Sequence, residues 1–361
     1  MSGIGYLSYM GMAEETDYRT AVTVTDKIPI ISEGIIEEYA RIDSDYLDGK
    51  SGRREDDQGP LSVLGPTEVV LVHDEVDSAE FVGCNLPLAI AMGTATWDAG
   101  TGANQITLAE SPDESATIAF EKTTSIHEIV SAMCKGFSIS GAAGEDIRCS
   151  LDWIGYDYLA GGTTNASSDL NTLPTVVPSR LIFCDLTFRM ATDMSDALAA
   201  GDKVAISAFT INYDAALSDP QFATGLNTAS NPYGTVCGKT LKPERNGFRE
   251  VTMELTIPRY AADTWRTAMA NDSAIQADFT FTASATRNFY IYLPYLKVMD
   301  VSDPIESADI ITETVTLKAF RGASYNAGAG NTVMKFTDAS TVIAEEFAIE
   351  TDNDRTAAII T

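Results

Sequence analysis

The sequence is poor in basic residues. Its 361 residues include 24 Lys and Arg against 52 Asp and Glu, which gives a formal net charge of −28. Sequence-specific binding to a nucleic-acid backbone needs cationic side chains that displace counterions, so this balance argues against it, and an anionic membrane surface is disfavoured as well. No run approaches 18 apolar residues, and no basic residue precedes Arg19, so neither a membrane-spanning helix nor a secretory signal is expected.

Residues that carry common chemistry are also scarce. The two histidines, His73 and His127, have no Cys or His at the spacing of a metal site, and the sequence holds neither a nucleophile-elbow motif nor a nucleotide-binding motif. The five cysteines form no CxxC pair, and four lie in or beside apolar stretches, which predicts buried, reduced thiols. We therefore expect no metal, no cofactor and no catalytic residue.

What the sequence does have is strand patterning. Apolar residues make up 45% of the chain, enough for a sizeable core. Phe137 and Ile139 alternate with polar residues on one arm, and alternate positions over 147–153 do so on the next, with a turn signal at 141–144 between them. This period of two predicts a half-buried β-hairpin, and the fold class is predicted to be mainly β.

The order of these elements occurs twice, which indicates an internal duplication. Each half is predicted to contain a strand, a long polar loop, a strand, a short helix and three more strands. A short helix is predicted within 75–92. The paired ranges are 28–39 with 204–213, 61–73 with 248–258, the helical ranges 76–92 with 261–270, then 116–120 with 279–283, 126–140 with 288–299 and 146–156 with 310–320. A segment rich in small and polar residues, 161–178, is predicted to link a first domain (1–160) to a second (179–322), which leaves a tail at 323–361.

Charge is distributed unevenly along the chain. From Glu55 to Glu121 there are 67 residues with 13 acids and no Lys or Arg, so the first half presents a continuous negative field. Just before it, the loop at 43–57 mixes acids with Lys50, Arg53 and Arg54, which favours either a solvated loop or reciprocal ionic contacts with a neighbouring molecule.

Several segments, in order, resemble the bacteriophage major tail tube proteins that carry two fused tube domains. These are residues 5–35, 43–65 with the pattern around Gly52, Gly59 and Gly65, the hairpin at 120–158, and the strands at 205–217, 288–305 and 311–320. The resemblance covers about residues 5 to 322. The insert at 93–115 and the tail depart from it.

The resemblance implies two tandem β-sandwich domains, each with a short flanking helix, whose inner strands form a shared β-barrel in a ring. Duplicated chains of this kind form trimers with pseudo-sixfold symmetry that stack into a tube. DNA passes through the tube without specific binding, and other tail proteins contact the tube ends. The protein would thus belong to the virion tail and be assembled in the host cytoplasm.

Within this hypothesis the loops at 43–57 and 214–247 are predicted to make contacts between subunits or rings. The candidate contact residues are Asp45, Asp48, Lys50, Arg53, Arg54, Asp56, Asp57, Lys242 and Arg245. Acids of the two long hairpins, Glu128, Asp146 and Asp152, are candidates for the lumen. The alternatives are another β-rich virion component (a tail-completion, baseplate-hub or capsid-decoration protein), a secreted acidic adhesin or carbohydrate-binding module, and an enzyme.

Overall fold

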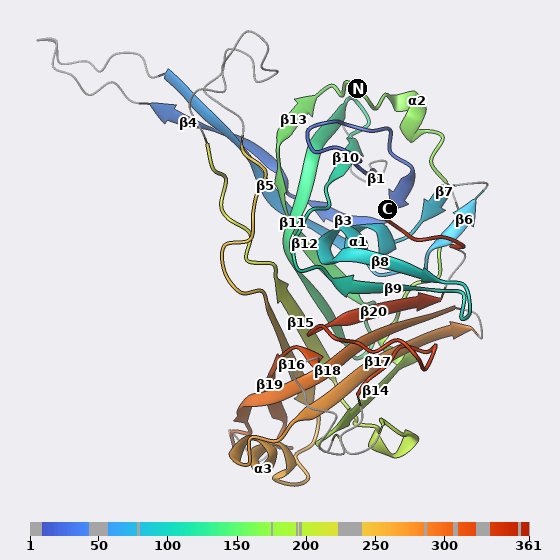
Figure 1. The fold of residues 1–361 in the computed structure, drawn as a ribbon, viewed down its shortest axis with the longest axis vertical. Helices are drawn as coiled ribbons and strands as arrows, with labels where there is room; N and C mark the ends of the chain where they lie inside the picture. Colours follow the sequence, from blue (N-terminus) through green and yellow to red (C-terminus); the bar gives the residue numbers. More distant parts are fainter. Residues whose placement is uncertain are drawn as a thin grey trace, which may run out of the picture.

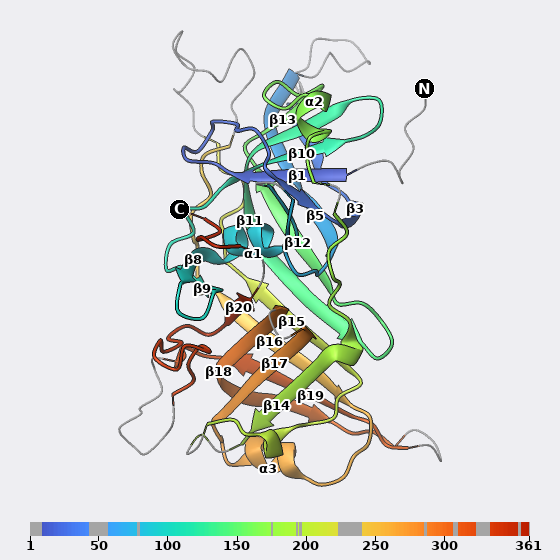
Figure 2. The same cartoon turned by 90° about the vertical axis from the view of Figure 1, so that its right-hand side faces the viewer.

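The computed structural model is mainly β, with 20 strands and three short α-helices in the part of the chain that it describes (Figure 1). It describes residues 9–42, 57–77, 80–174, 176–192, 194, 197–222, 240–284, 287–305, 310–322, 333–352 and 355–360. The molecule is elongated, with β1, β10 and β13 towards one end and α3 at the other (Figures 1 and 2).

The strands of the N-terminal part are β1 (Tyr9–Glu14), β2 (Asp26–Ile28), β3 (Ile30–Glu33), β4 (Ile36–Ile42), β5 (Asp57–Val70), β6 (Glu75–Asp77), β7 (Glu80–Val82), β8 (Gly93–Asp98), β9 (Ala103–Leu108), β10 (Ala116–Glu121), β11 (Ile126–Ala142), β12 (Arg148–Gly155) and β13 (Asp157–Ala160). Those that follow are β14 (Leu186–Ala191), β15 (Ala208–Asp214), β16 (Glu250–Ile257), β17 (Ile275–Ser284), β18 (Arg287–Ser302), β19 (Glu313–Ala319) and β20 (Ala348–Asp352). The helices are α1 (Asn85–Met92), α2 (Ser167–Leu170) and α3 (Thr264–Ala270).

One continuous antiparallel sheet runs through both parts of the chain. Its order is β3 and β4 at the first edge, then β5, β12, β11, β15, β16, β19 and β18. The two parts meet where β11 pairs with β15 over seven residue pairs, from Gly136 opposite Asp214 to Ala142 opposite Ala208.

The strands of this sheet alternate between a buried and an exposed face. In β16, Val251, Met253 and Leu255 are fully buried, and Glu254 between them is exposed. Across the β11–β15 joint, Phe137 lies opposite Tyr213 on the buried face, with ring centroids 5.1 Å apart. The period of two in the sequence thus gives one apolar and one polar face.

The same order of strand pairing occurs twice. In the first part it is β4–β5–β12–β11–β10, and in the second it is β15–β16–β19–β18–β17. Even the irregularities recur: β11 skips Lys135 in its pairing with β12, and β18 skips Met299 in its pairing with β19. The strands predicted from the sequence at 116–120, 126–140, 146–156, 204–213 and 248–258 are all present.

The predicted helix at 75–92 is partly wrong. Glu75–Asp77 and Glu80–Val82 form the strands β6 and β7, and the helix begins only at Asn85. Pro87 does not shorten it, because it lies in the first turn, where the backbone N–H groups have no helical partner. Gly93, with a φ of 86°, ends it in the left-handed conformation. Helix α1 is buried along its whole length against the apolar side of β11 and the hairpin β8–β9.

Two segments outside the predicted repeat, the expected linker and the C-terminal tail, pack against the repeated strands. Much of the expected linker at 161–178 is folded, with α2, Leu170 and Leu173 packed on Val24 and Ile126. The C-terminal strand β20 lies between β18 and β9, antiparallel to both, so the tail joins the hairpin β8–β9 to the second part of the chain (Figure 1). No helix in the described ranges is long and apolar enough to cross a membrane.

Candidate functional site: a polar sheet face with two open edges

The exposed side of the continuous sheet is a regular polar surface, and we call it the polar face. The strand registers place its residues on one side. Ser, Thr and Asn are twelve of its 22 polar members, while Ile36 on β4 and Leu64, Pro66 and Val70 on β5 are apolar exceptions. Its polar members are Ser32, Glu38, Ser62, Glu68, Arg148, Ser150, Asp152, Ser138, Ser140, Thr210, Asn212, Asp214, Glu250, Thr252, Glu254, Thr256, Thr314, Thr316, Lys318, Lys297, Asp300 and Ser302.

The polar face carries an excess of negative charge. Seven of its residues are acids and three are bases, and each base is engaged by an acid: Arg148 binds Glu68 at 3.1 Å, Lys318 binds Glu250 at 2.7 Å and Lys297 binds Asp272 at 2.6 Å. Among the described residues, Asp152, Glu254 and Asp300 form no ion pair and remain exposed. Charges arranged on a surface in this way repel a polyanion.

The three candidate lumen residues lie in different environments. Asp152 is exposed on the polar face, and Asp146 is half-buried at its end, where its carboxylate binds Arg180 at 2.9 Å. The prediction that Glu128 faces the lumen is wrong for this residue, because its side chain is completely buried. Its carboxylate accepts hydrogen bonds from the backbone N–H groups of Thr164 and Asn165, and so it anchors the segment after β13.

Glu254 and Asp300 of the polar face are not among the lumen candidates chosen from the sequence, although the sequence contains a signal for Glu254. The alternation of Val251, Met253 and Leu255 already assigns Glu254 to the opposite face of its strand. Which face is exposed depends on what packs against it, so the alternation alone does not identify a lumen residue.

Most of the candidate contact residues of the first loop, Asp45, Asp48, Lys50, Arg53, Arg54 and Asp56, lie outside the described residues. Asp57 begins β5, and its side chain lies outside them too. Lys242 and Arg245 are described, and both act within the chain. Lys242 donates to the Asp113 carboxylate at 2.7 Å, and Arg245 donates to the carbonyls of Ala215, Glu110 and Ala109.

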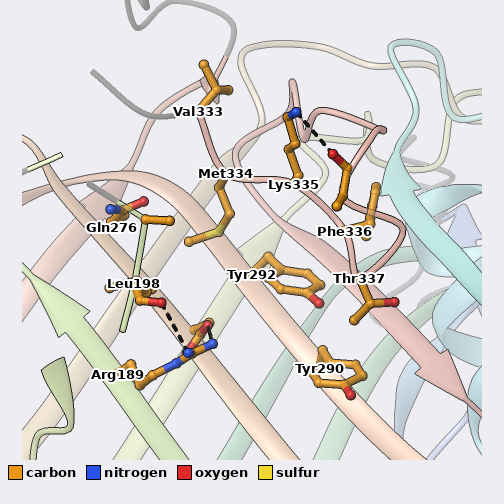
Figure 3. Close-up of a pocket in the computed structure, with 13 residues that line it drawn as sticks. Arg189, Leu198, Gln276, Tyr290, Tyr292, Val333, Met334, Lys335, Phe336 and Thr337 are labelled. Atoms are coloured by element: carbon orange, nitrogen blue, oxygen red, sulfur yellow. Dashed lines mark hydrogen bonds and ion pairs between the residues drawn. The ribbon is translucent and has the colours of Figure 1, made fainter. Parts of the chain in front are cut away.

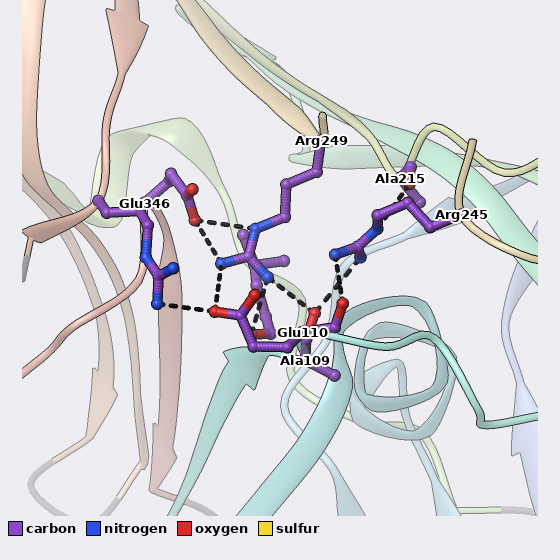
Figure 4. Close-up of polar contacts among 8 residues, drawn as sticks. Ala109, Glu110, Ala215, Arg245, Arg249 and Glu346 are labelled. Carbon is purple, nitrogen blue, oxygen red and sulfur yellow. Dashed lines mark hydrogen bonds and ion pairs between the residues drawn. The ribbon is translucent and has the colours of Figure 1, made fainter. Parts of the chain in front are cut away.

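Arg249 is the centre of a junction between three parts of the chain (Figure 4). Its guanidinium donates to the carbonyls of Leu108 and Ala109 at the end of β9, at 3.1 and 2.7 Å, and to the Glu346 carboxylate in the tail. Glu110 also binds Arg321 at 2.7 Å. Because the Arg249 side chain is only 6% exposed, these are strong contacts that fix the tail against both parts of the sheet.

A second, more deeply buried junction lies near the C-terminus. Arg355 binds the carboxylates of Asp26 and Asp74, and its guanidinium carbon lies 4.0 Å from the centre of the Phe81 ring. Burial raises the pKa of Asp26, and Arg355 opposes that rise. The tail is therefore held at both ends of β20 by charged contacts.

The cavity between the tail and the second part of the chain has a volume of about 420 Å³ (Figure 3). Tyr290 and Tyr292 of β18 line one side, with rings stacked 6.0 Å apart, and Met334 and Phe336 of the tail line the other. The charged groups at its base, Asp278 and Arg189, bind each other. The lining is thus that of an apolar gap between two packed segments.

Buried ionisable groups elsewhere serve the fold. Burial raises the pKa of Glu15, whose carboxylate accepts hydrogen bonds from Ser131, Thr117 and Ser115. Burial lowers the pKa of His73 to about 4, with a smaller contribution from Arg287. Within the described ranges, no group of three or more His, Cys, Asp or Glu is placed to hold a metal ion. Cys84, Cys134 and Cys149 are buried free thiols as predicted, whereas Cys184 is exposed.

The two edges of the continuous sheet are open. In the described structure β4 is paired only with β5, and β18 from Lys297 to Ser302 is paired only with β19. Six of the eleven large apolar side chains that are exposed in the described part lie at these edges: Ile31, Ile36, Ile42, Met299, Ile305 and Ile310. Unpaired strand edges with exposed apolar residues are places where a further strand adds readily.

The fold and the site define the class: a mainly β protein with a polar, acidic sheet face and two open strand edges. The model of the phage tail tube protein family matches residues 5–319, and the chain belongs to this family. The family match bears out the resemblance seen in the sequence and makes the protein a structural tail component. It stops before β20 and the tail junctions. No curated protein sequence matches the chain.

Proposed function

We propose that this chain is the tube-forming subunit of a phage tail, three copies of which close into a ring. The observation that carries the proposal is the β11–β15 joint, where two parts with the same pairing order share one sheet. On this view the chain consists of two tube domains, at 1–160 and 179–322, fused through that joint. The open edges are then the places where the next copies bind, because a heterologous contact closes into a ring when its rotation permits.

The nine strands of the continuous sheet fill eight positions, because β3 and β4 lie end to end beside β5. Three copies therefore supply 24 positions of one large barrel. A closed barrel of about 24 strands, spaced about 4.8 Å apart and tilted by about 40°, has a diameter of about 48 Å between opposite backbones. Barrels of about 16–18 strands already enclose an aqueous channel, so a barrel of this size has an open lumen.

The polar face is proposed to line this lumen, with Asp152, Glu254 and Asp300 among its exposed acids. A cationic wall would bind phosphates and slow the passage of DNA, whereas an anionic wall repels them. Each subunit adds a net charge of −28 to the assembly. The chain would be assembled in the host cytoplasm, with other tail proteins at the ends of the tube.

Electron microscopy of the purified protein tests this proposal. Stacked rings with threefold symmetry and a hollow centre are the expected result. Dispersed monomers under every assembly condition would refute the proposal, and a single ring that never stacks would favour another virion role, such as tail completion or a baseplate hub.

A further inference from the structure

We infer that β4 of one copy pairs with the open edge of β18 in the next copy, in the register that β15 adopts against β11, and that a like-charged pair at the end of this short ladder weakens the contact between copies. The inference rests on the proposed function and specifies the contact by residue.

The register follows from the residues that lie opposite one another across successive strands, and we call each such set a row. Asp300 and Gly136 each follow the skipped residue of their strand, so they hold equivalent places. The row in the first part is Gly34, Pro66, Asp152 and Gly136, and the row in the second part is Thr210, Glu254, Thr316 and Asp300.

The pairing of β11 with β15 inside the chain gives the register for the pairing of β18 with β4 of the next copy. Gly136 lies opposite Asp214, which is four residues beyond Thr210. Glu38 is four residues beyond Gly34, the equivalent of Thr210, so Asp300 of one copy faces Glu38 of the next. The following pairs are then Val301 with Glu37, Ser302 with Ile36, and Asp303 with Ile35.

The ladder between copies is shorter than the internal one. A Cβ at Gly136 would lie 2.5 Å from the Tyr213 carbonyl oxygen, so Asp300, which has a Cβ in that place, forces the strands apart at this end. Pro304 has no N–H and limits the ladder at the other end. Three pairs therefore remain, against seven in the β11–β15 joint.

Charge adds to this weakness. Asp300 and Glu38 are both exposed, and like charges directly opposite each other in a sheet are destabilising. Ile36, 61% exposed, and Ile305, 79% exposed, supply the apolar surface that closure covers. The balance predicts subunits that stay apart at low ionic strength and close as salt screens the carboxylates.

Cysteine cross-linking tests the register in a background with Cys184→Ser and Cys237→Ser. Ser302→Cys with Ile36→Cys is the expected pair, and oxidation should give a ladder of covalent dimers and trimers. Ser302→Cys with Glu37→Cys is the matched control, because a shift of one residue moves a side chain to the other face. All three positions are at the surface or on the open edge, and circular dichroism checks that each variant is folded.

A charge-reversal cycle tests the electrostatic part. Asp300→Lys or Glu38→Lys alone makes the facing pair attractive and should raise the cross-linking yield at low salt by roughly two- to fivefold. The double variant restores repulsion between two lysines and should return the yield to the wild-type level.

The outcomes separate the two proposals. Tubes that form while only the control pair cross-links would overturn the register and leave the proposed function intact. Equal yields in all charge variants would overturn the electrostatic part. Monomers in the microscope with no cross-link in either pair would overturn both.

Discussion

Replacement of Arg355 by Met removes one charge from a buried cluster of three. Arg355 is 7% exposed, and its partners Asp26 and Asp74 are 4% and 0% exposed. Methionine fills much of the space of the arginine stem but leaves two carboxylates facing each other away from water. Breaking a buried ion pair by removing one partner costs about 3–5 kcal/mol of unfolding free energy. This is a large part of the roughly 5–15 kcal/mol that keeps a domain folded.

The sign of the pH dependence is also fixed by the structure. Burial already raises the pKa of Asp26, and loss of Arg355 removes the group that opposes this rise. A carboxyl with a raised folded-state pKa has its full stability below the unfolded pKa of about 3.9 and loses it as pH rises through the folded pKa. The variant should therefore be less destabilised at pH 5 than at pH 7.

Urea denaturation at both pH values, followed by tryptophan fluorescence, measures the effect. Two matched variants make it specific. Arg180→Met breaks an exposed ion pair with Asp146, whose side chains are 62% and 30% exposed, and should cost under about 1 kcal/mol. The triple variant Arg355→Met, Asp26→Asn, Asp74→Asn removes every charge of the cluster and should recover much of the loss. If Arg355→Met costs no more than Arg180→Met, the reasoning about the buried cluster fails.

Three further predictions concern other parts of the chain. Burial lowers the pKa of His73 to about 4, so the unfolded chain binds the proton more tightly than the folded chain does. Acidification from pH 7 to 5 should therefore lower the unfolding free energy by roughly 2 kcal/mol, a loss that a His73→Asn variant does not show. Equal pH slopes of the two proteins in urea titrations would contradict this. Gly136→Ala should lower the unfolding free energy in urea titrations by roughly 1–3 kcal/mol, because its Cβ meets the Tyr213 carbonyl oxygen across the β11–β15 joint. Gly201→Ala, whose Cβ has no atom within 4 Å, should leave it unchanged. Deletion of residues 44–56 should leave a folded protein that does not polymerise, and normal tubes in the electron microscope would count against a contact role for this loop.

Local patterns predicted the elements that depend on local physics. The alternation at 137–139 and 147–153 gave the hairpin β11–β12, because side chains of a strand point to opposite faces whatever it pairs with. The prediction of a helix from residue 75 failed at its start, because Val76 and Val82 lie in two short strands, β6 and β7. A short apolar pattern does not determine a helix when neighbouring strand edges offer hydrogen bonds instead.

The position of charges was harder to predict. Glu128 and Asp152 are both acids of the same long hairpin, yet the first is buried under Asn165 and the second is exposed. Lys242 and Arg245 are predicted to contact a neighbouring copy, and the sequence carries no signal for the bonds that they form within the chain, to the segment after β9. A charged side chain has no sequence signal for its partner, because the partner is brought to it by distant strands.

The sequence by itself determined that the chain is acidic and mainly β, with an order of strands that occurs twice, and it carried the resemblance to the tail tube family that the family match confirms. Only the tertiary structure decided that β11 pairs with β15, that β20 lies between β9 and β18, and that Arg355 meets Asp26 across 329 positions of the chain. The physical reason is that alternation specifies which side of a strand is buried. Backbone hydrogen bonds, which are the same for nearly every residue, then join any two edges that the packing of the core brings together.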